Sequence, residues 1–155
     1  MEHDQEEEVS VRAKQIHEQD GQRTYALVFD TGDEVMEGLT KFAKDEGLDA
    51  ANLTAIGAFS EVKLGFYDLE KQVYEENPVG EQVEVLSLVG DIATKEDGEP
   101  QVHAHVVVGL RDGTAKGGHL LEARVRPTLE VVLVESPEHL RRRMDEASGL
   151  ALIKL

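Results

Sequence analysis

Apolar and polar residues alternate along most of this 155-residue chain, and one segment alone has clear helical spacing. Successive side chains of a strand point to opposite faces, so alternation with a period of two predicts strands. The pattern predicts strands at 24–29, three times within 52–76 (the third one short), at 81–93, on both sides of Asp112-Gly113, at 127–135 and in the final "LALIKL".

The segment 33–47 predicts the main helix. Its apolar residues recur at steps of three and four and build one face: Val35, Met36, Leu39, Phe42 and Ala43. Asp33 is placed to cap this helix and Gly47 to end it. A shorter helix is predicted in "SPEHLRRRMDEASG", from about Pro137. Around seven or eight of these nine segments as strands, with one main helix, predict a single compact α+β domain, in which the helix packs on a mainly antiparallel central sheet.

Charge and composition limit the classes of function. The chain has 32 acidic and 16 basic residues, a net charge of −16, which repels phosphate backbones and argues against direct binding of nucleic acid. It has no cysteine, so thiolate metal sites are excluded. No apolar run has the roughly 18 residues that a membrane helix needs. The start "MEHDQEEEVS" is acidic, unlike a secretory signal, so we expect a cytoplasmic protein with a disordered acidic tail at 1–8 and one domain at 9–155.

The stretch "HAHVVVGLRDGTAKGGHL", residues 103–120, holds three of the six histidines. In a strand, Val102, Ala104, Val106 and Val108 share an apolar face, whereas His103 and His105 share the other. Their Cα atoms then lie about 7 Å apart, a separation that lets two rings converge on one ion. The other histidines, His3, His17 and His139, lie among polar residues and are predicted to be surface groups.

The face of the strand on which the ring of His119 lies depends on how the chain turns before it. A two-residue turn at Asp112-Gly113 pairs His119 with Val106, which places its ring on the wrong face. A bulge at Gly117-Gly118 adds one residue and brings the ring to the side of His103 and His105. A three-histidine site therefore requires this bulge or a histidine from another subunit.

Three neutral imidazoles suit zinc, nickel, copper or iron better than magnesium or calcium. A fourth position left to water would permit hydrolysis, but catalysis also needs a general base. The sequence does not single one out, and Asp91 and Glu84 are no more than guesses. Whether the chain is an enzyme stays open. A hydrogen-bonded histidine pair without any ion is the alternative interpretation.

Four segments carry a resemblance to a known family: "AIGAFSEVKLGFYD", "EVLSLVGDIA", "HAHVVVGLRDGTAKGGHLLEARVRPTLEVVLVE" and "LRRRMDEASGLALIKL". In this order they resemble the PPC (plant- and prokaryote-conserved) domain over about residues 22–155, in its stand-alone prokaryotic form. The resemblance implies a homotrimer and, because some members contain metal, a divalent ion on His103, His105 and His119, with Zn²⁺ the first expectation.

The resemblance also implies an alternative, a DNA-associated regulatory or interaction module without a functional metal. Plant members carry AT-hooks, whose core is Arg-Gly-Arg-Pro. This chain has "RVRP" at 124–127, with valine in place of glycine and strand-like flanks, so a structural role is predicted there. A small ligand between subunits is a third possibility, with Gly57, Gly90, Gly117 and Gly118 permitting close approach, although bends in a curved sheet explain these glycines more simply.

Overall fold

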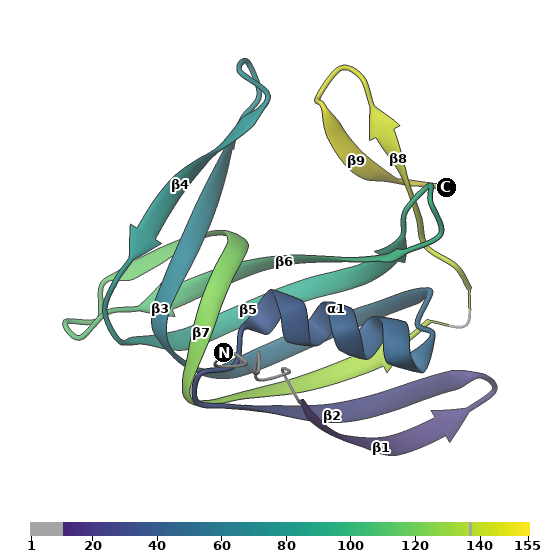
Figure 1. Cartoon of the computed structure of the whole chain (residues 1–155), viewed down its shortest axis with the longest axis horizontal. Coiled ribbons are helices and arrows are strands. Elements are labelled where there is room, and N and C mark those ends of the chain that lie inside the picture. The colour runs from purple at the N-terminus through teal and green to yellow at the C-terminus, as the bar shows by residue number, and fades with distance from the viewer. Residues whose placement is uncertain (1–10, 137) are drawn as a thin grey trace, which may run out of the picture.

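The computed structural model describes residues 11–136 and 138–155. In this part of the chain nine strands and one helix form a single domain, with the helix lying across the sheet (Figure 1). The strands are β1 (Arg12–Gln19), β2 (Gln22–Asp30), β3 (Ala50–Asp68), β4 (Val73–Val79), β5 (Val83–Thr94), β6 (Pro100–Gly109), β7 (Ala115–Glu135), β8 (Arg141–Asp145) and β9 (Leu150–Lys154). The helix is α1 (Val35–Glu46). Within residues 11–136 and 138–155, no helix is long and apolar enough to cross a membrane.

Two long strands organise the sheet. β3 pairs with β5 along its first half and with β4 near its end, while β7 pairs with β6 at its start and then with β3 and β2. Since β5 also pairs with β6, the strands β3, β5, β6 and β7 close into a ring. Every ladder is antiparallel except one parallel bridge between Thr94 of β5 and Arg141 of β8, so the sheet is mixed rather than purely antiparallel.

The core lies between α1 and the sheet. The predicted apolar face of α1 is buried in one cluster with side chains of β2, β6 and β7, including Leu27, Phe29, Val106 and Leu133. The alternation predicted for the histidine strand is confirmed, because Val102, Ala104, Val106 and Val108 are all buried. β6 therefore presents His103 and His105 on the face of the sheet opposite to this core.

Two details of the sequence prediction are corrected, and a third is not tested. The cap of α1 is Glu34, whose carboxylate accepts from the N–H of Glu37, whereas Asp33 accepts from the N–H of Asp30. In β5, a register shift between Val85 and Ser87 breaks the expected alternation, so that Leu88 is buried. The predicted tail at 1–8 lies outside the described residues.

The second predicted helix is wrong. Residues 141–145 form β8, which turns through Gly149 (φ 75°) into the expected C-terminal strand, β9. The segment has helix-forming residues, but β8 gains a pairing partner in β9 and buries Arg142 against Asp91 of β5. Tertiary contacts of this kind override local propensity. Pro137, the expected start of the helix, is not among the described residues.

An ion pair fastens β2 to the end of β7 and makes stability depend on pH. Arg23 Nε donates to Glu135 Oε2 at 2.6 Å, and this hydrogen bond holds the pKa of Glu135 below its ordinary value. A carboxyl with a lowered pKa in the folded state stabilises the fold above its unfolded pKa and loses that effect as the pH falls through the folded value.

We therefore expect Glu135→Gln to lower the free energy of unfolding by roughly 1–2 kcal/mol at pH 7. The difference from wild type should shrink below about pH 4.5 and vanish once Glu135 itself is protonated. Urea unfolding at a series of pH values measures this. Asp30→Asn, which breaks the exposed Arg12–Asp30 pair, is the control and should change stability little. An equal loss for Glu135→Gln at pH 7 and pH 3 would contradict this role.

Candidate metal centre

The loop between β6 and β7 decides where His119 lies. The N–H of Leu110 donates to the carbonyl of Thr114 at 2.8 Å, and the N–H of Gly113 donates to the carbonyl of Leu110 at 2.9 Å. Three residues, 111–113, therefore form the loop, with Gly113 in the left-handed conformation (φ 83°) that closes hairpin loops of this length. The expected two-residue turn is wrong.

This one-residue difference in the loop moves His119 to the correct face. His119 pairs with His105, and the ladder runs on without a shift to the pair of Gly109 and Ala115. The bulge predicted at Gly117-Gly118 is consequently absent. Gly118 has another use, because a Cβ there would lie 2.7 Å from the carbonyl oxygen of Gly65, so glycine lets β7 approach β3 closely beside His119.

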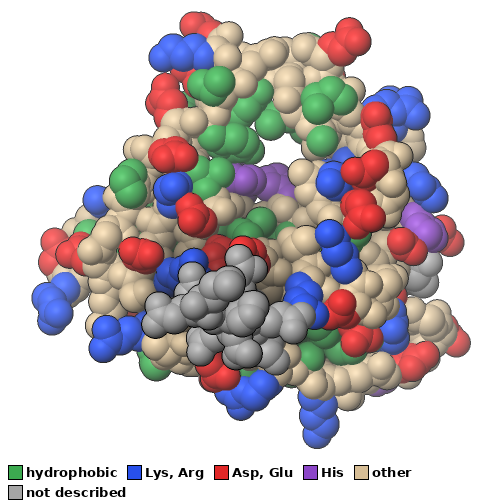
Figure 2. Space-filling model, viewed as in Figure 1, with side chains coloured by type: hydrophobic (Ala, Val, Ile, Leu, Met, Phe, Trp, Pro, Cys, Tyr) green, Lys and Arg blue, Asp and Glu red, His purple; other side chains and the backbone are tan. Residues whose placement is uncertain are grey.

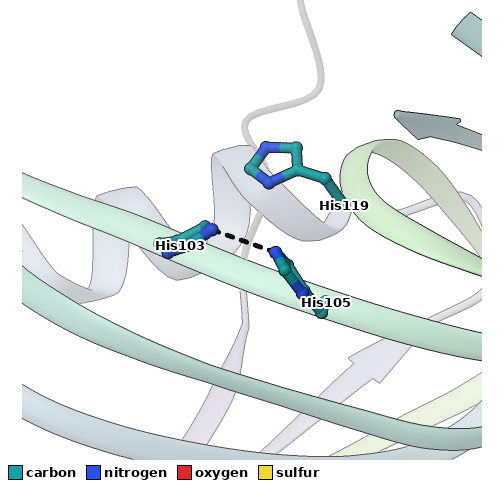
Figure 3. A group of neighbouring side chains, drawn as sticks. All are labelled: His103, His105 and His119. Carbon is teal, nitrogen blue, oxygen red and sulfur yellow. Dashed lines mark hydrogen bonds between the residues drawn. The ribbon is translucent and has the colours of Figure 1, made fainter. Parts of the chain in front are cut away.

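The three predicted ligands come together within one chain. Each of His103, His105 and His119 offers a ring nitrogen, and these nitrogens all lie within 4.8 Å of one another. Figure 3 shows the three rings gathered above β6, with His119 reaching in from β7. Nε2 of His103 is 3.2 Å from Nε2 of His105. No histidine from a second subunit is needed to complete the cluster.

The outer sides of two rings have polar neighbours. Nδ1 of His119 lies 3.5 Å from the hydroxyl of Tyr74, whose ring stacks on the imidazole. Nδ1 of His103 lies 3.4 Å from Nη2 of Arg142, and Nη2 also donates to Asp91. A histidine that binds a metal usually donates the N–H of its second nitrogen to an acceptor, which fixes the orientation of the ring. The hydroxyl of Tyr74 can accept from His119 in this way, whereas the guanidinium of Arg142 cannot accept from His103.

The contact with Arg142 also indicates which ring nitrogen of His103 carries the proton when no ion is bound. A guanidinium only donates, so Nδ1 of His103 accepts there, and the proton of His103 sits on Nε2, where it donates to His105. Coordination through Nε2 requires this proton to move to Nδ1. Arg142 keeps its bonds to Asp91 and to the carbonyl of Ala151 in that case.

The surroundings favour neutral imidazoles, the form that binds metals. Burial lowers the pKa of His119 to about 4, helped by the neighbouring His103 and His105. Burial also lowers the pKa of His103, together with the positive charge of Arg142. Because a metal ion competes with protons for imidazole nitrogen, lowered pKa values keep these ligands ready near neutral pH.

The donor set fits a divalent transition metal. Ligand nitrogens at about 2.0–2.1 Å from a tetrahedral ion are about 3.3 Å apart, close to the separation of the His103 and His105 nitrogens. Imidazole donors without a carboxylate suit zinc and its neighbours better than calcium or magnesium. With three protein ligands, one coordination position of a tetrahedral ion faces outward.

A pocket of about 490 Å³ opens over the cluster, between two projecting hairpins. Figure 2 shows the hollow between these arms, with histidine side chains at its base. The β3–β4 arm contributes Phe66, Tyr67 and Tyr74, and the β8–β9 arm contributes Arg142 and Leu152. The tips of the arms touch where the hydroxyl of Tyr67 donates to the carbonyl of Ser148 at 2.6 Å. The histidines therefore lie in a pocket between two hairpins rather than on an open sheet surface.

The other residues considered from the sequence lie elsewhere or act indirectly. His17 is exposed on β1, and His139 is half-exposed with Nδ1 3.5 Å from Asp49. Glu84 lies opposite Gly109, at the far end of the ladder from His103. Asp91 lies beside His103 but binds Arg142. Sequence reasoning missed Arg142 and Tyr74, since a predicted helix hid the first and no motif marked the second.

Comparison with known proteins agrees with this architecture. Residues 16–137 match the Plants and Prokaryotes Conserved (PCC) domain, the PPC family expected from the sequence. The chain belongs to this family. No curated protein matches it.

Three solved structures are similar over most of the chain. A PPC protein from Pyrococcus horikoshii is 33% identical, with 94% of this chain and 95% of that chain covered and a TM-score of 0.80. A metal-containing protein from Archaeoglobus fulgidus is 35% identical, with coverage of 85% and 93% and a TM-score of 0.78. A protein from Bacteroides thetaiotaomicron, described as a candidate DNA-binding protein, is 26% identical, with coverage of 93% and 96% and a TM-score of 0.84.

Proposed function

We propose that this chain is a metal-binding PPC-domain protein that holds one divalent transition ion, with zinc the first choice, on His103, His105 and His119. The observation that carries the proposal is the convergence of three ring nitrogens within 4.8 Å beneath a pocket. Its metal-containing relative from A. fulgidus supports the same function. An ion held by three imidazoles keeps a coordination position for water or a ligand, so the site suits either ligand binding or hydrolysis.

Metal analysis of protein purified without a histidine tag tests this site. We expect close to one ion per chain in the wild type and at least a tenfold lower content in His105→Ala, because two imidazoles no longer close the coordination shell. His17→Ala is the matched control, since it removes an exposed histidine of β1 and should keep the full metal content. Equal trace amounts in all three proteins would discard the metal site.

We also propose that three copies of the chain associate through the exposed face of the sheet. Pairing across β7, β3, β5 and β6 puts Val132, Thr54, Val89 and His105 in one row on this face. Large apolar side chains are exposed along these strands: Ile56, Leu86, Val89, Val107 and Val132. Exposed apolar side chains gathered on neighbouring strands are typical of protein–protein interfaces. The trimer implied by the family resemblance would cover it.

Substitution on this face tests the assembly. Ile56 is 61% exposed, so Ile56→Lys should leave the fold of the chain intact while it places a charge in the interface. We expect sedimentation to give a mass of three chains for the wild type and of one chain for the variant. Ile16→Lys, at an exposed position of β1, is the control and should stay trimeric. A wild-type protein that sediments as a single chain at micromolar concentration would contradict the proposal.

A DNA-associated role is the second candidate, supported by the relative from B. thetaiotaomicron. The charge of the chain opposes direct binding, and "RVRP" lies inside β7 with Val125 buried, which does not resemble a flexible AT-hook. The role compatible with these features is an interaction module that reaches DNA through a partner protein.

Mobility shifts with A·T-rich duplex DNA test whether the chain itself binds DNA. We expect no retention up to micromolar protein at 150 mM salt, because a surface with a net charge of −16 gains nothing from displacing counterions on DNA. Salt-sensitive retention at nanomolar protein would favour the DNA-associated role.

A further inference from the structure

We infer that the pocket above the three histidines binds a small carboxylate with an apolar body, whose carboxylate occupies the open position of the metal ion. This inference rests on the proposed metal site and adds the class of ligand. Its basis is the distribution of charged and apolar side chains around the hollow.

Acidic residues are absent from the described lining of this pocket, although the chain has 32 of them. The polar lining consists of the three histidines, Tyr67, Tyr74, Gln101 and Arg142. The nearest carboxylate, that of Asp91, is bonded to Arg142, and these two charges offset each other. A divalent ion on three neutral imidazoles therefore keeps its full charge in the pocket, and an anionic ligand is the natural partner for the remaining position.

Arg142 lies in the wall of the pocket beside His103 but adds no net charge there, because Asp91 offsets it. Its side chain is only 5% exposed, and its Nε lacks a hydrogen-bond partner among the described residues, although Asp91 and the carbonyl of Ala151 bind its Nη atoms. Gln101 contributes a second buried atom without a partner, Oε1. Neither atom has exposed surface, so neither contacts a ligand in the pocket directly, and the preference for an anion rests on the metal ion and on the absence of acidic side chains from the described lining.

Apolar side chains from both arms line the pocket, and we therefore infer that the rest of the ligand is apolar. Phe66 is 63% exposed and Leu152 is 44% exposed, and both line the same pocket from opposite arms. Leu150 and Tyr67 line the same pocket. The volume of about 490 Å³ falls within the roughly 300–1,000 Å³ of small-molecule sites. The pocket thus combines a cationic base with an apolar mouth.

A smaller cavity of about 220 Å³ beside β4 shows the contrast. Three glutamates contribute to its lining, and Lys63 there is already bonded to Glu122 at 2.9 Å. Its lining has three acidic and two basic side chains, so it offers no comparable preference for an anion. The net charge of the whole chain further disfavours multiply charged anions, which leaves a monocarboxylate as the best match for the histidine pocket.

Cobalt-loaded protein provides a direct readout, because the visible absorption of Co²⁺ changes when its ligands change. The probes are benzoate, the neutral and similarly shaped benzamide, acetate and inorganic phosphate. We expect benzoate to shift the cobalt band with saturation, to bind at least about tenfold more tightly than acetate because its ring is buried, and to exceed benzamide and phosphate by a similar factor. Benzoate should not bind the metal-free protein with comparable affinity.

Two pairs of variants separate charge from apolar contact. Gln101→Glu adds a negative charge to the wall and should weaken benzoate about tenfold, whereas Gln82→Glu adds the same charge at an exposed position outside the pocket and should not. Phe66→Ala should weaken benzoate but not acetate. Leu69→Ala is its control, since Leu69 is 65% exposed on the same arm and lies outside the lining.

The metal content of each sample keeps the two hypotheses apart. Protein that takes up no cobalt refutes the proposed metal site itself. Protein that holds cobalt at one ion per chain, but binds benzamide or phosphate as well as benzoate, overturns the inferred ligand class and leaves the metal site intact.

Discussion

The register between β6 and β7 is the constraint on which the site depends. Side chains alternate across a sheet, so a slip of one residue would turn the ring of His119 to the core face. The three-residue loop at 111–113 sets this register, and Gly113 adopts the left-handed conformation that the loop requires. His103 and His105 share a face because they are two residues apart in one strand. His119 lies on the same face only because the loop between β6 and β7 has three residues.

Burial and charge act in the same direction at this cluster. The core on the other side of the sheet holds β6 in place through Val102, Ala104, Val106 and Val108. The two arms partly bury the rings, which keeps His119 and His103 neutral. Arg142 links β8 to Asp91 of β5 beside the rings. The C-terminal hairpin therefore completes the site electrostatically as well as forming one of its walls.

Most strands, α1 and the shared face of His103 and His105 could be predicted from the sequence because they follow from local periodicity. Alternation gave the face of His103 and His105, and the spacing of Val35 to Ala43 gave α1. Errors arose where pairing partners distant in sequence decide the outcome. Residues 141–145 have no strong alternation, and only pairing with β9 and the ion pair with Asp91 make them a strand. Turn length is similarly ambiguous, since Asp112-Gly113 fits loops of two or three residues.

The location of the missed residues explains why the pocket was invisible to sequence reasoning. Tyr74 and Arg142 belong to separate hairpins that meet only in the folded chain, where Tyr67 bonds to Ser148. Neither residue forms a motif with the histidines, yet each contacts the outer nitrogen of one of them. A motif within a single strand therefore points to the histidines of the proposed site, whereas the residues that contact their rings and shape the pocket come from the tertiary arrangement. A shared His-x-His motif therefore need not imply a shared ligand among members of this family, because the arms and not the motif line most of the pocket.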